Sequence, residues 1–152
     1  MQIKTILVPC DFSDYAERAY LWAVGFAEKW AAKIILVHAA QLFTSLGYPE
    51  SVYLIDLKKM EDEILADAEK RLREFIAKKG SSPVVVEPIA VTGDPFWEIC
   101  QTAEKEHADL IVMGSHGRTG LAHVVLGSVA ERVVRHAPCP VLVARVQKEA
   151  AK

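Results

Sequence analysis

A glycine-rich segment that follows an apolar run is the part of the sequence best suited to chemistry. Leu110–Met113 is continuous and apolar, and Gly114, Gly117 and Gly120 come directly after it. Glycine allows left-handed backbone conformations and lets amide N–H groups approach an anion, because no Cβ stands in the way. The segment therefore predicts a loop that cradles a phosphate.

A second anion-binding element is predicted ten residues beyond Gly117, where Gly127 and Ser128 open a helical pattern. The N-terminus of a helix attracts anions through its free N–H groups and its dipole, and the Ser128 hydroxyl would add a donor. Arg118, Arg132 and Arg135 make this part of the chain locally basic, which favours an anion site only weakly. Together the loop and the helix could wrap a polyphosphate.

The common nucleotide-binding signatures are absent. The chain contains neither G-x-x-x-x-G-K-[ST] nor G-x-G-x-x-G, which disfavours lysine-assisted phosphoryl transfer and a dinucleotide fold. His116 lies inside the glycine-rich segment, but no carboxylate at a fixed spacing orients it, so a contact with phosphate or solvent is favoured over catalysis.

Asp11 is the other candidate, in the segment Pro9–Ser13 after the first apolar run. Its spacing fits two roles equally well: contact with a ligand, or bracing of its own loop and the following helix. Both readings stay open on the residues alone.

The elements that would position these residues alternate short β-branched runs with longer helical patterns, which is typical of a parallel sheet with crossover helices. The five expected strands are at about 3–8, 34–39, 84–91, 110–113 and 141–144. The four expected helices follow Ser13, run from about 57 to 79, follow Asp94-Pro95, and run from about 127 to 136. If the strand order is 3-2-1-4-5, the Asp11 loop and the glycine-rich loop are neighbours at the point where the order reverses, which is where open parallel sheets bind ligands.

Composition limits the class of protein. The 152 residues suit one domain, expected at 1–146, with a frayed tail at 147–152. The apolar runs are much shorter than the roughly 20 residues of a membrane span, and no export signal precedes the first strand, so we expect a cytoplasmic protein. The net charge of −2 gives no overall field that would attract nucleic acid, and three unpaired cysteines fit reduced thiols.

Three segments together carry a resemblance to a known family. They are Ile-Leu-Val-Pro-Cys-Asp-Phe-Ser at 6–13, the pattern G-x2-G-x9-G-S formed by Gly114, Gly117, Gly127 and Ser128, and Pro-Cys-Pro-Val-Leu-Val at 138–143. Nearly the whole chain resembles the ATP-binding branch of the universal stress proteins. The resemblance implies a Rossmann-like α/β fold, an open five-stranded parallel sheet of order 3-2-1-4-5 with helices on both faces, and ATP bound across the switch point.

The resemblance also implies roles for individual residues. Asp11 would bond the ribose or lie near the adenine; Pro9 and the backbone of Ala39 would line the base; Met113 would close the pocket; Gly114, Gly117, Gly127, Ser128 and Val129 would hold ribose and phosphates, with Arg118 close by. Two departures from the family pattern, Ala39 in place of a common valine and Ala130 in place of an occasional hydroxyl residue, imply a somewhat lower phosphate affinity.

These observations predict a nucleotide-dependent regulatory or stress-response protein that binds ATP, with Mg²⁺ or Mn²⁺ entering through the phosphates. The sequence shows no nucleophile or carboxylate pair for fast turnover, so hydrolysis would be slow at most. Two alternatives stay open: a slow ATP hydrolase or nucleotidyl transferase, and a dimeric interaction module without a ligand. Val141, Leu142 and Val143 are expected at a sheet edge, and the resemblance implies a homodimer through that strand.

Overall fold

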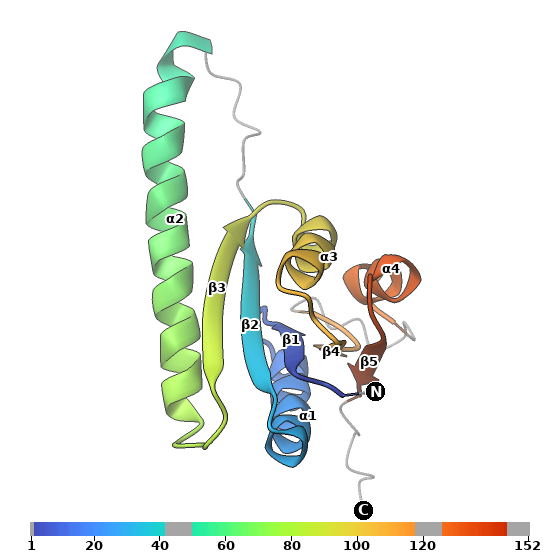
Figure 1. Cartoon of the computed structure of the whole chain (residues 1–152). Helices are drawn as coiled ribbons and strands as arrows, with labels where there is room; N and C mark the ends of the chain where they lie inside the picture. Colours follow the sequence, from blue (N-terminus) through green and yellow to red (C-terminus); the bar gives the residue numbers. More distant parts are fainter. Residues whose placement is uncertain (1, 42–49, 118–125, 146–152) are drawn as a thin grey trace, which may run out of the picture.

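The computed structural model describes residues 2–41, 50–117 and 126–145, in which strands and helices alternate along the chain (Figure 1). The strands are β1 (Thr5–Pro9), β2 (Lys33–Ala40), β3 (Val86–Thr92), β4 (Leu110–Gly114) and β5 (Val141–Ala144). The helices are α1 (Asp14–Trp30), α2 (Glu50–Lys78), α3 (Pro95–Lys105) and α4 (Ser128–His136). The expected types and order of the elements are confirmed. Among the described residues, no helix combines the length and the apolar character that a membrane crossing needs.

The five strands form one sheet in the order β3-β2-β1-β4-β5, and every neighbouring pair is parallel. The expected strand order is therefore confirmed. The order reverses between β1 and β4, where Ile6 pairs with Leu110 and Leu7 with Ile111. Beyond this pair of strands, the chain leaves β1 and β4 in opposite directions, so a crevice opens at their carboxyl ends.

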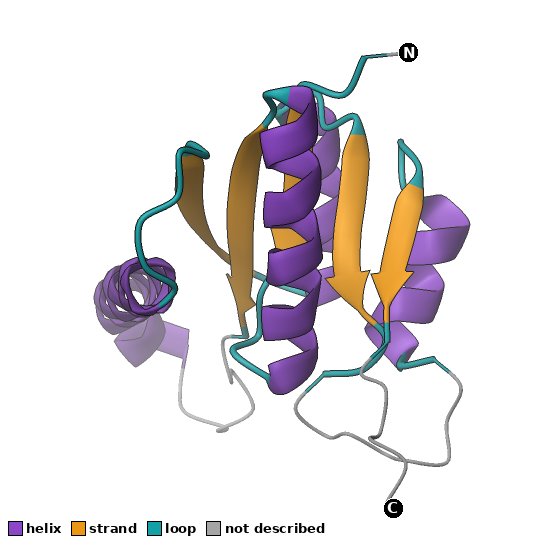
Figure 2. Ribbon diagram, turned by 90° about the horizontal axis from the view of Figure 1, so that it is seen from below, coloured by secondary structure: helices purple, strands orange, loops and turns teal. Residues whose placement is uncertain are grey.

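Helices cover both faces of the sheet, as Figure 2 shows. Successive side chains of a strand point to opposite faces, so Ile6 and Val8 pack under α1 and α2 while Leu7 packs under α3 and α4. Each face has its own apolar cluster of fully buried side chains, with Leu72 of α2 on one side and Val133 of α4 on the other. The sheet is thus buried on both faces, which explains its continuous apolar strands.

Three helices begin beside the crevice, each with a different cap. The Ser13 Oγ accepts a hydrogen bond from the Ala16 N–H at 3.2 Å and starts α1. The Asp94 carboxylate accepts from the Trp97 N–H at 3.2 Å and starts α3. The cap of α4 is Gly127, which has no side chain to offer its free N–H groups. Of these three helices, α4 is therefore the one whose N-terminal donors are not met by its own cap side chain.

Two strands begin later than the apolar pattern predicts. β1 starts at Thr5, because the N–H groups of Lys4 and Thr5 donate to the Asp109 carboxylate, at 2.7 and 3.0 Å. These two hydrogen bonds lower the pKa of Asp109. β3 starts at Val86, because the Val84 N–H donates to the Ser82 hydroxyl in the preceding turn. The predictions for Gly120 and for the tail at 147–152 lie outside the described residues.

Candidate nucleotide-binding site

A cleft of about 530 Å³ opens at the carboxyl edge of the sheet, at the switch point. Its walls come from the ends of β1, β2 and β4, from the loop after β4, and from the first turn of α4. The structure brings together nine of the residues proposed from the sequence: Pro9, Asp11, Ala39, Met113, Gly114, Gly117, Gly127, Ser128 and Val129. The tenth, Arg118, lies outside the described residues. The size of the cleft suits a ligand of a few hundred cubic ångströms, such as a nucleotide.

The glycines around the cleft are required for two different reasons. A Cβ on Gly114 would lie 2.8 Å from the Tyr15 Cβ and 2.9 Å from its carbonyl oxygen, so this glycine lets β4 end against the backbone of α1. A Cβ on Gly117 would instead lie 2.7 Å from the Asp11 Oδ2, which belongs to a side chain. Gly117 and Asp11 therefore face each other closely across the cleft, and the expected proximity of their two loops is confirmed.

The first turn of α4 presents backbone donors to the cleft. Ser128, Val129 and Ala130 all line it, and N–H groups in the first turn of a helix have no partner within the helix. The Gly127 N–H is used by the Ser115 carbonyl oxygen at 2.7 Å, which holds the start of α4 against the loop after β4. This arrangement offers several donors and the positive end of a helix dipole to an anion.

Asp11 braces its own loop, which is one of the two roles that its spacing predicted, and it also lines the cleft. Its Oδ1 accepts from the Ser13 N–H at 3.1 Å and from the Ser13 Oγ at 2.5 Å, which braces the loop that starts α1. The other oxygen, Oδ2, is the one that faces Gly117. One carboxylate oxygen thus holds the loop while the other is presented on the cleft side.

His38 is buried, as its apolar strand predicts, but it also lines the cleft. Its Nδ1 lies 2.6 Å from the Cys10 carbonyl oxygen; a carbonyl only accepts, so Nδ1 carries the proton and donates. This bond ties the end of β2 to the loop after β1. Burial raises the pKa of the neighbouring Cys10 thiol to about 11, which keeps it protonated and unreactive at neutral pH.

His116 packs beside the start of α1. Its Nδ1 lies 3.0 Å from the Ser115 Oγ, and its ring centroid lies 5.2 Å from that of Tyr15. It lines the cleft next to Gly117, where a phosphate contact is possible. These contacts hold the imidazole beside Ser115 and Tyr15 at the rim of the cleft.

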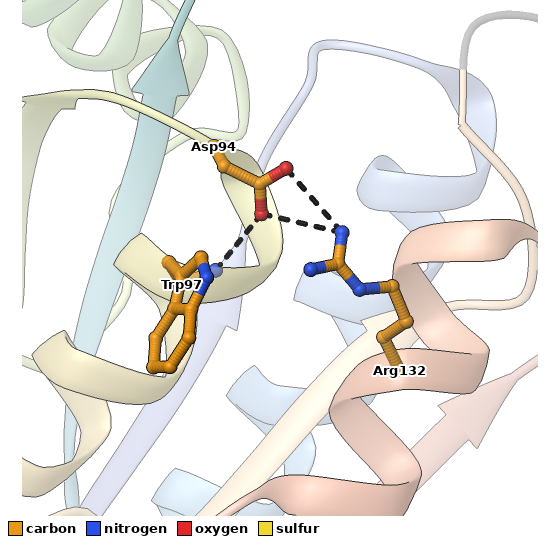
Figure 3. A network of polar contacts seen from close by, with 3 residues as sticks. All are labelled: Asp94, Trp97 and Arg132. Atoms are coloured by element: carbon orange, nitrogen blue, oxygen red, sulfur yellow. Dashed lines mark hydrogen bonds and ion pairs between the residues drawn. The ribbon is translucent and has the colours of Figure 1, made fainter.

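Two of the arginines that make the segment around α4 basic, Arg132 and Arg135, form ion pairs outside the cleft. The Arg132 guanidinium lies 3.3 and 3.4 Å from the two oxygens of Asp94, the cap of α3, as Figure 3 shows. Arg135 pairs with Glu131 one turn earlier on α4, at 2.9 Å. Neither of these two arginines lines the cleft, so they do not contribute a direct contact to an anion bound there.

Sequence reasoning missed Arg71, a cation that does line the cleft. It extends from α2, whose alternating charges read as a solvated helix face. Its guanidinium lies 4.1 Å from the centre of the Phe12 ring, a contact between elements far apart in the sequence. Gln41, Pro95 and Ile99 were missed for the same reason: each belongs to an ordinary loop, cap or core pattern, and only the fold carries it to the cleft.

Comparison of the sequence and the fold with known proteins identifies one family. A family model described as the Universal stress protein family matches residues 2–145. Universal stress protein MJ0531 of Methanocaldococcus jannaschii is 34% identical over 96% of this chain and 84% of its own length. The solved structure of MJ0577 from the same organism superimposes with a TM-score of 0.80 at 30% identity, covering 98% of this chain and 100% of that one.

Two more distant solved structures share the fold and are described with nucleotides. A universal stress protein in complex with cAMP has a TM-score of 0.67 at 24% identity and covers 97% of this chain and 100% of that one. A family member from Arabidopsis thaliana with AMP bound has a TM-score of 0.61 at 24% identity, covering 95% and 92%. On the family match and the relatives above 30% identity, this chain belongs to the universal stress protein family.

Proposed function

We propose that this chain is a regulatory protein of the stress response that binds ATP in the cleft at its switch point. The first turn of α4 carries this proposal, because it opens on the cleft with a glycine cap and no capping side chain. The cAMP and AMP structures show only that proteins of this fold are found with adenine nucleotides. The case for ATP here rests on this chain's own donors and on its likeness to the family.

The proposed orientation of the ligand follows from the backbone donors at the α4 end of the cleft. The phosphates would lie against Gly117 and the N–H groups of Ser128 and Val129, where the helix dipole favours negative charge. The ribose would lie near Asp11 and Gly114, and the base between Pro9, the Ala39 backbone and Met113. Within the described ranges, no three His, Cys, Asp or Glu side chains gather as a metal site, so Mg²⁺ or Mn²⁺ would be held chiefly through the phosphates.

The proposed role is binding and signalling rather than fast catalysis. ATP would stabilise one conformation of the loops around the cleft, and a partner would read that state in the cytoplasm. We further propose that a second copy of the chain covers the free edge of β5. Slow hydrolysis is the alternative, and it is separated from simple binding by following ADP and AMP during the titration.

The test is calorimetric titration of ATP with Mg²⁺ into the wild-type protein and into Gly117→Val. Valine at this position would enter the space beside the Asp11 Oδ2, so binding should fall by at least about tenfold, roughly 1.4 kcal/mol, while the fold is kept. The matched control is Gly25→Val on α1, where an added Cβ meets nothing within 4 Å. A folded wild type that binds no ATP would overturn the proposal and favour an interaction module.

A further inference from the structure

The two ends of the cleft are chemically different, and Arg71 belongs to the end away from α4. The helix α2 packs against β2 and β3, and the cleft residues that come from β2 and from the residue just after it are those at the end of the strand, from Val37 to Gln41. The first turn of α4 lies on the other side of β1, beyond β4. A nucleotide whose phosphates lie at α4 therefore extends its base toward Ala39, Gln41 and Arg71.

Phe12 forms a platform that holds the Arg71 guanidinium at this place. The backbone φ of Phe12 is 66°, a left-handed conformation that is costly for a bulky residue. Its ring packs on His38 at 4.7 Å and on Phe75 at 6.4 Å between centroids, and these contacts oppose that cost. The guanidinium carbon lies over the Phe12 ring, 4.1 Å from its centre, a cation–π contact that does not use up the N–H donors of Arg71.

The donors of Arg71 are not taken up by an ion pair among the described side chains. By contrast, Arg73 of α2 pairs with Glu69 at 2.5 Å, and Lys79, just after α2, pairs with Glu17 of α1. Arg71 takes part in none of the ion pairs found in the described parts of the chain. Its N–H groups can therefore serve a ligand without first breaking such a pair.

We propose that Arg71 is a specificity-determining residue that donates hydrogen bonds to acceptor atoms on the edge of the bound purine base. A guanidinium offers donors and no acceptor, so it recognises ring nitrogens or carbonyl oxygens. Adenine presents its ring nitrogens N1, N3 and N7 as acceptors. The inference rests on the proposed function, because it assumes that a nucleotide lies in the cleft with its phosphates at α4.

The first experiment compares Arg71→Met with Arg73→Met by calorimetry, using ATP and inorganic tripolyphosphate. Methionine keeps an apolar stem over Phe12 but has no donor. Arg71→Met should weaken ATP binding by about ten- to a hundredfold, the range for a hydrogen bond from a charged group, and leave tripolyphosphate binding unchanged. Arg73→Met, on the same helix but outside the cleft, should change neither.

A second experiment separates a direct contact from a structural one. In the wild type, at least one of 1-deaza-, 3-deaza- and 7-deaza-ATP should bind more weakly than ATP, because it lacks the nitrogen that Arg71 contacts. Arg71→Met should bind that analogue and ATP equally well. If Arg71 only supported Phe12, all these ligands would weaken together and the preference for ATP over the analogue would persist, which would overturn the inference.

The remaining outcomes are also decisive. Unchanged ATP affinity in Arg71→Met would overturn this inference and leave the proposed function standing. A parallel loss of tripolyphosphate affinity would place Arg71 at the phosphates and overturn it as well. A wild type that binds no ATP would instead remove the proposed function, and this inference with it.

Discussion

Gly114 ends β4 and Gly117 lies three positions later in the following loop, yet alanine should affect stability at Gly114 much more than at Gly117. Alanine at Gly114 meets the Tyr15 backbone at less than 3 Å, and a helix backbone cannot move aside cheaply. Gly114→Ala should therefore lower the free energy of unfolding by about 2 kcal/mol, as overpacked sites do. Urea unfolding followed by circular dichroism measures this.

Gly117→Ala is the matched comparison, because its added Cβ meets only the end of the Asp11 side chain. Its free energy of unfolding should stay within about 0.5 kcal/mol of the wild type, the usual range at sites without a fixed backbone clash. Equal losses of stability in the two variants would contradict this assignment of roles.

At the scale of single residues, the sequence predicted which residues lie together at the cleft, but not every contact that each of them makes. The glycine spacing was sufficient to place Gly114 and Gly117 at one cleft. It could not reveal that Gly114 is required by Tyr15, because that contact depends on how α1 crosses the end of β4. Arg71 was missed for a similar reason: its sequence neighbours describe a solvated helix, and its partner Phe12 comes from another element.

At the scale of elements, Asp94 combines a helix cap with an ion pair, and the two contributions can be measured apart (Figure 3). Asp94→Ala removes both and should cost about 1 kcal/mol, the usual contribution of an N-cap. Asp94→Asn keeps an oxygen for the Trp97 N–H and loses only an exposed ion pair, so it should cost less than about 0.5 kcal/mol. Thermal unfolding of both variants is the measurement, and equal losses would show that the pair with Arg132 matters more than the cap.

The bounds of the elements were predictable where local signals set them. The capping residues Ser13 and Asp94, the latter followed by Pro95, predict the starts of α1 and α3. The apolar runs predict the positions of the strands. The start of β1 was not predictable, because it depends on Asp109, which comes from the segment before β4. The Asp109 carboxylate accepts from the N–H groups of Lys4 and Thr5, which are therefore not available to a neighbouring strand.

For the whole molecule, β5 is one of the two edge strands of the sheet, and β3 is the other. Among the described residues β5 pairs with β4 alone, and Val141, Leu142 and Val143 are half-buried. The Ala144 carbonyl oxygen accepts from the Ser115 N–H of the β4 side, so the polar groups of Val143, one residue earlier, face the open edge. In the proposed dimer, this edge would pair with a second copy of the chain.

We therefore expect a homodimer at micromolar concentration, and a monomer for Val143→Pro. Proline removes the outward N–H of Val143 and leaves the hydrogen bonds between β4 and β5 in place. Sedimentation velocity gives the oligomeric state, and retained ATP binding would show that the variant is folded. A monomeric wild type would contradict the dimer without affecting the ATP proposal.

The pairing of Ile6 with Leu110 has a consequence for how the chain is made. During synthesis, β1 must wait until about a hundred more residues have left the ribosome before its second neighbour exists, and closing so long a loop is entropically costly and slow. Until then, β1 can pair only with β2, and its inner edge would be open to other nascent chains. Because the two walls of the cleft come from opposite sides of that late pairing, nucleotide affinity should appear only when folding is complete.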